Sequence, residues 1–134
     1  MPSHPFLAAG AAHSSQVALL FRAKHDEVVI RLIDADRFAI LTEFRTALFF
    51  HEMALSGDGS KLAAINADYI AIWKDLSQPE PAIRINHSFS ERQGGHYIGW
   101  CQGHWVVSSN QRSQRRGSLL RILSEEEGSL LAEI

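Results

Sequence analysis

Three short apolar segments recur along the chain at long, similar intervals. IRLID (residues 30–34), IAIWK (70–74) and LRILS (120–124) align without gaps, at offsets of 40 and 50 residues. Each is followed by a polar connection and a second apolar run. A pattern of strand, glycine-containing turn and strand also occurs twice, in HEMALSGDGSKLAAIN and HYIGWCQGHWVVSSN. A period of this length indicates a repeat architecture, in which each unit buries its apolar faces against its neighbours.

The repeated segments have the character of β-strands. In YIAIW (69–73) both sets of alternating residues are apolar, so a strand there must be covered on two faces. The run is too short for a buried helix, and glycine, aspartate and asparagine on either side favour turns. A helix over FLAAGAAHSSQVALL (6–20) is the competing interpretation of the first unit. Gly10 and the Ser14–Ser15 pair interrupt its helical face, so we expect strands there as well.

The pattern therefore predicts a single all-β domain over residues 1–134, made of about three four-stranded antiparallel units at 4–46, 47–92 and 93–134. The expected strands are 4–11, 16–24, 27–34 and 37–44, then 48–55, 61–66, 69–75 and 82–89, and finally 96–102, 104–110, 118–124 and 129–134.

The second unit resembles a known family. LSGDGSKLAAIN-ADYIAIWKD follows the strand, Asp-Gly turn, strand and I-x-I-W course of a WD40-type repeat, although Lys74 follows Trp73 where the family has aspartate. The chain thus resembles the β-propeller superfamily, with divergent WD40-like repeats. The resemblance implies that the units are propeller blades, that the first strand of each blade lines a central channel and that the inner strands pack against neighbouring blades on both faces.

Three blades raise a difficulty of closure. Propellers close with about four to eight blades, so both outer faces of a three-blade unit would be open. We expect a piece of a larger propeller, or copies that associate to complete a ring. A β-sandwich or barrel is the alternative architecture. In the propeller arrangement Ile30, Ile72, Trp73 and Ile122 are expected to be buried on inner strands.

Composition narrows the classes of function. Thirteen Lys and Arg against fifteen Asp and Glu leave a net charge of −2, which gives no basic field for nucleic acid or for an anionic membrane. No apolar run approaches the ~20 residues of a transmembrane helix. The single Cys101 makes no internal disulfide, which fits a reducing compartment, and we expect a cytoplasmic protein.

Histidines provide the sharpest candidate for chemistry. His4, His51 and His96 occur near the start of the first strand in each unit, so in a propeller they are candidates to line the channel. Three imidazoles there can bind a metal or a substrate, although capping of strand ends is the favoured interpretation. The set His96, Cys101 and His104 matches no standard zinc spacing. We therefore expect no metal and no cofactor.

Charged residues outside the strands give one further candidate. Glu125–Glu127, Asp34 and Asp36 are interpreted as solvated turn residues, and no catalytic motif is present. Arg112, Arg115 and Arg116 lie together in the longest predicted hairpin loop and are candidates to bind an acidic partner through their guanidinium groups.

Two classes of function follow from these observations. The favoured one is a non-catalytic scaffold that binds protein partners. The alternative is a propeller-type hydrolase or lactonase fragment with a site in the channel. A truncated product without a function of its own is a third possibility.

Overall fold

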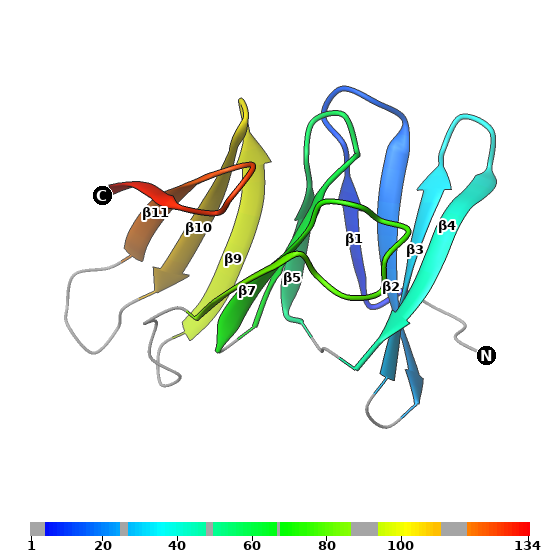
Figure 1. Cartoon of the computed structure of the whole chain (residues 1–134), viewed down its shortest axis with the longest axis horizontal. Helices are drawn as coiled ribbons and strands as arrows, with labels where there is room; N and C mark the ends of the chain where they lie inside the picture. The colour runs from blue at the N-terminus through cyan, green and yellow to red at the C-terminus, as the bar shows by residue number, and fades with distance from the viewer. Residues whose placement is uncertain (1–4, 25–26, 48–49, 67, 87–93, 111–117) are drawn as a thin grey trace.

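The computed structural model describes residues 5–24, 27–47, 50–66, 68–86, 94–110 and 118–134 (Figure 1). In these ranges the regular secondary structure consists of β-strands alone. They form three separate antiparallel sheets of four strands each. None of the described segments is a helix long and apolar enough to cross a bilayer.

Each sheet is a meander of consecutive strands, which we call a blade. Blade 1 contains β1 (Leu7–Gly10), β2 (Gln16–Lys24), β3 (Glu27–Asp34) and β4 (Ala39–Thr46). Blade 2 contains β5 (Glu52–Leu55), β6 (Leu62–Ile65), β7 (Tyr69–Trp73) and β8 (Ile83–Asn86). Blade 3 contains β9 (Gly94–Cys101), β10 (His104–Asn110), β11 (Ser118–Ser124) and β12 (Leu130–Glu133).

All twelve predicted strands are confirmed. The helix considered for residues 6–20 is wrong, because a turn separates β1 from β2 and the two strands pair antiparallel. The expected start of the second blade at residue 48 also differs, since β5 begins at Glu52.

The blades stand side by side with blade 2 in the middle (Figure 1), and the first strands β1, β5 and β9 are neighbours. One face of blade 1 packs on blade 2 in a core that includes Leu20, Ile30 and Trp73. The other face of blade 2 packs on blade 3 around Ile72 and Trp105. This radial arrangement is that of propeller blades and differs from the facing sheets of a sandwich.

The burial predicted for the inner strands is confirmed for three residues out of four. Ile30, Ile72 and Trp73 have 1%, 0% and 0% of their surface exposed. Ile122 is only partly buried. It lies beside Val106, whose neighbour Val107 packs on blade 2, so Ile122 faces away from the other blades.

The outer face of β3 carries one arginine between apolar residues. Alternation places Val29, Arg31 and Ile33 on the face that points away from blade 2. Arg31 pairs with Glu43 at 2.6 Å, and its guanidinium lies 5.1 Å from the centre of the Phe21 ring. The long arginine side chain covers apolar surface on this face, which is one reason why Phe21 is only 7% exposed.

Candidate functional site

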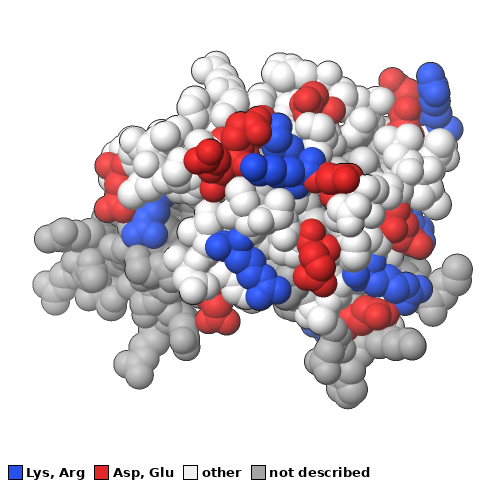
Figure 2. Space-filling model, in the orientation of Figure 1, with Lys and Arg blue, Asp and Glu red and all other residues white. Residues whose placement is uncertain are grey.

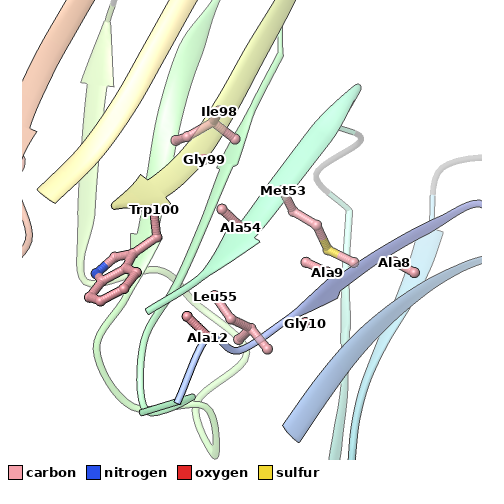
Figure 3. Close-up of a pocket in the computed structure, with 10 residues that line it drawn as sticks. All are labelled: Ala8, Ala9, Gly10, Ala12, Met53, Ala54, Leu55, Ile98, Gly99 and Trp100. Atoms are coloured by element: carbon pink, nitrogen blue, oxygen red, sulfur yellow. The ribbon is translucent and has the colours of Figure 1, made fainter. Parts of the chain in front are cut away.

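The first strands of the three blades, β1, β5 and β9, line an open pocket of about 220 Å³ where a propeller has its central channel (Figure 3). Each blade contributes to it through the residues of its first strand. The lining consists of Ala8, Ala9, Gly10, Ala12, Met53, Ala54, Leu55, Ile98, Gly99 and Trp100.

Small and apolar side chains give this pocket its character. Six of the ten lining residues are alanine or glycine, and none of the ten carries an ionisable side chain. Trp100 lies at one side of the pocket, and its indole Nε1 donates a hydrogen bond to Glu125. The described residues of its lining supply no side chain for proton transfer.

Of the three histidines that were candidates to line the channel, the structure describes the side chain of one. His51 is exposed, precedes β5 and is not among the pocket residues, and its backbone N–H bonds Ile65 O at 2.9 Å. His4 and the side chain of His96 lie outside the described residues. Convergence of the three imidazoles therefore stays an untested candidate, and capping of strand ends stays the favoured interpretation.

The second histidine cluster has a simple local geometry. Cys101 and His104 are opposite each other in the hairpin between β9 and β10, and Cys101 is exposed. In the ranges with described side chains no group of three His, Cys, Asp or Glu residues has the spacing of a metal site.

An interaction network at the turns joins the blades, and sequence reasoning missed it. Lys61, before β6, pairs with Glu125 at 3.0 Å and with Glu126 at 3.1 Å in the turn between β11 and β12. On the other side of the same blade, the His13 N–H donates to Gly57 O at 2.7 Å. The turn of blade 2 is thereby tied to both neighbouring blades.

The expectation that Glu125 is a solvated turn residue is wrong. Its side chain is only 21% exposed, and it accepts hydrogen bonds from both Lys61 and Trp100. The hydrogen bond to Glu125 is the largest cause of a raised pKa for Lys61, and the hydrogen bond to Glu126 raises it further. No local sequence signal reveals them, because Lys61 and Glu125 are 64 positions apart.

The Asp-Gly turn of blade 2 is held by its own aspartate. Asp58 Oδ1 accepts hydrogen bonds from the Ser60 N–H at 2.9 Å, the Ser60 hydroxyl at 2.7 Å and the Ser56 hydroxyl at 3.0 Å. The bonds from Ser60, followed by the bond from Ser56, lower the pKa of Asp58 to about 2. This carboxylate has a structural role in the turn.

Close packing around Gly57 explains a glycine at that position. A Cβ there would lie 2.5 Å from the Trp100 ring and 2.8 Å from His13. The two rings approach edge to face with centres 5.7 Å apart. Blades 1, 2 and 3 therefore meet at this one glycine.

The remaining charged candidates divide into two groups. Asp34 is the last residue of β3, where the Ser15 hydroxyl donates a hydrogen bond to it at 2.8 Å and lowers its pKa, and Asp36 in the following turn is exposed as predicted. Arg112, Arg115 and Arg116 lie outside the described residues. On the face shown in Figure 2, acidic and basic side chains are interspersed, and the described residues form no large patch of one charge there.

Solved structures with a similar fold are β-propellers. Hsv2 of Kluyveromyces marxianus superposes with a TM-score of 0.68 at 16% identity, over 97% of this chain and 48% of that chain. The propeller domain of Cps50 (Swd1) from Myceliophteria thermophila has a TM-score of 0.59 at 9% identity, over 100% of this chain and 38% of that one. Hydrazine synthase from Kuenenia stuttgartiensis has a TM-score of 0.64 at 14% identity, over 97% of this chain and 36% of that chain.

No protein-family model matches the sequence, and no curated protein matches it either. At these identities the structural likeness establishes the fold. The chain is a partial β-propeller of three four-stranded blades, and it spans less than half the length of the solved propellers just described.

Proposed function

We propose that this chain is a non-catalytic, WD40-like scaffold for protein partners, and that it forms part of a larger or oligomer-completed propeller. One observation carries the proposal. The pocket at the first strands, where a channel site for hydrolysis would lie, is lined by ten described residues without an ionisable side chain.

Rigidity of the three-blade unit supports a scaffold role. Two continuous apolar cores join the blades, and the turns are tied together by the Gly57 and Lys61 contacts. A rigid sheet framework positions loops for recognition at little entropic cost. The solved neighbours include hydrazine synthase, so the fold alone does not choose between a scaffold and an enzyme.

The proposed contact for the partner is the arginine cluster of residues 112–116. Its composition suits an acidic peptide surface, since guanidinium groups bind carboxylates with paired hydrogen bonds. The single exposed Cys101 suits a reducing compartment, and we place this role in the cytoplasm.

Affinity capture of the tagged chain from its own cells, with chemical cross-linking, tests the proposal. We expect a stoichiometric protein partner that is lost when Arg112, Arg115 and Arg116 are all replaced by alanine. Arg37→Ala is the matched control, because the Arg37 side chain is 84% exposed in a turn outside this cluster.

Two results would contradict the proposal. Retention of the partner by the triple variant would show that the arginine cluster is not the contact. Turnover of ester or lactone substrates that His51→Ala abolishes, without any stoichiometric partner, would favour the hydrolase alternative.

A further inference from the structure

The two outer faces of the three-blade unit have the same residue pattern as the faces that are already packed inside it. Each internal junction joins the face of one blade that carries Ile30 or Ile70 to the face of the next blade that carries Trp73 or Leu123. One face of each kind has no neighbour in the described chain: the face of blade 1 around Val17, Leu19 and Ile33, and the face of blade 3 around Leu120, Ile122 and Ile134.

Strand register shows that the outer face of blade 1 is equivalent to two buried faces. Val17 lies opposite Ile33, as Leu62 lies opposite Trp73 and Trp105 opposite Leu123. In blades 2 and 3 these four residues are at most 4% exposed, whereas Val17 and Ile33 are half-buried. Leu19, one pair further along, is also half-buried, while its counterparts Ala64 and Val107 are fully covered.

The outer face of blade 3 is equivalent to the other kind of buried face. Leu120 and Ile134 exchange backbone hydrogen bonds, at the position where blade 1 pairs Ile30 with Phe44. Ile30 and Phe44 are 1% and 6% exposed, but Ile134 is 76% exposed. An uncovered apolar face at a position that is otherwise buried indicates an interface.

Polar groups at the rim of these faces are complementary as well. In both internal junctions the residue just before the first core pair reaches a turn of the next blade. Gln16 contacts the turn between β5 and β6 at Gly59, and Lys61 pairs with Glu126 in the turn between β11 and β12. In blade 3 this position is His104, and the position of Glu126 in blade 1 is Asp36. If the Lys61–Glu126 contact is repeated where a blade 1 follows blade 3, the Asp36 carboxylate lies near the His104 imidazole.

We propose that the outer face of blade 3 binds the outer face of blade 1 from a second copy of this chain, so that two copies close a six-blade ring. This deepens the proposed function, because it assigns the missing part of the propeller to the chain itself. The contact joins two different faces. The ring therefore closes only when each chain spans half of the full rotation about the ring axis. Two equivalent junctions then form, and each repeats the packing of the two internal ones.

Light scattering and sedimentation of the purified full chain at micromolar concentration test the closed pair. We expect a mass of twice 15.0 kDa that does not grow with concentration. We expect Leu19→Lys on blade 1 and Ile122→Glu on blade 3 each to give a monomer with an unchanged circular dichroism spectrum. The matched control Glu80→Lys, at an exposed position of blade 2, keeps the double mass.

Mixing the two variants gives the sharpest outcome. A mixed pair has one junction with wild-type faces and one junction that joins the two introduced charges of opposite sign, so the double mass returns. Asp36→Lys and His104→Glu form a second pair for the same design. These two substitutions change the rim and leave the apolar faces intact. They provide the test if Leu19→Lys or Ile122→Glu fails to fold.

Several results would overturn the inference: a wild-type monomer, a mass that rises without limit, variants that remain paired, or variants that fail to complement on mixing in both sets. The partner capture separates this failure from failure of the scaffold. If the wild-type chain is a monomer that captures a partner, and the triple arginine variant loses that partner, the closed pair is refuted and the scaffold function is supported. If the chain forms the closed pair but captures no partner, only the scaffold function is refuted.

Discussion

Replacing Trp73 by alanine tests the repeat register and the junction of blades 1 and 2 together. The side chain is fully buried and lies between Phe44 and Phe50, with ring centres at 5.7 and 5.6 Å. Its Nε1 donates to Pro79 O at 3.3 Å, which fixes the connection between β7 and β8. Trp73→Ala therefore removes a large apolar volume from a core that joins two blades.

The expected loss of unfolding free energy is about 3–5 kcal/mol, the range for large aromatic truncations in protein cores. Loss of the indole hydrogen bond contributes about 0.5–1.5 kcal/mol of such a total. Urea unfolding at a fixed protein concentration measures the change, because a self-associating chain has a stability that depends on concentration. The slope of unfolding free energy against urea concentration should be the same for the wild type and Trp73→Ala if both proteins unfold in one step.

Two further variants separate burial from the mere loss of an aromatic ring. Trp73→Phe keeps most of the apolar contact and should cost less than Trp73→Ala. Phe38→Ala removes a ring that is 90% exposed and should change stability by less than ~0.5 kcal/mol. A cost below ~1 kcal/mol for Trp73→Ala would show that the residue is not in this core and would refute the blade register.

Three further perturbations address the turns and the channel. Gly57→Ala should cost ~1–3 kcal/mol, because its Cβ would lie 2.5 Å from Trp100, while Gly10→Ala, with nothing within 4 Å, should be nearly neutral; equal urea midpoints for the two would contradict the packing. The pKa of Asp58 is lowered from 3.8 to about 2, so its contribution to stability is present above pH 3.8 and is lost as the pH falls through about 2. Asp58→Asn should therefore flatten the fall in urea midpoint across that window, and an unchanged profile would argue against the turn hydrogen bonds. Zinc or calcium should leave the thermal midpoint unchanged, since a ligand that binds only the native state raises it; a saturable rise that His51→Ala removes would establish a histidine site.

Local signals in the sequence were enough to predict the strands and their grouping. Alternation and turn residues act over neighbouring positions, so segments such as YIAIW and the Asp-Gly turn at Asp58 are recognisable without any long-range contact. The repeat then fixed the order of the blades. Burial of Trp73 followed from its place in the middle unit, which has a neighbour on each side.

The candidate site was predictable only in its location. The first strands do surround a pocket, but the small apolar lining depends on which side of each strand faces the channel. A shift of one residue in register reverses every side chain, and sequence spacing does not resolve that choice for His51.

By itself, the sequence determined an all-β chain of three four-stranded units, because backbone propensity and turn chemistry are local properties. Only the tertiary structure decided which faces are covered. Ile122 has the same position in the repeat as the buried Ile72, yet it is partly exposed because no blade follows it in the described chain. Glu125 is bound by Lys61 and Trp100 because packing of blade 3 on blade 2 brings distant positions together, and no local rule encodes such a contact.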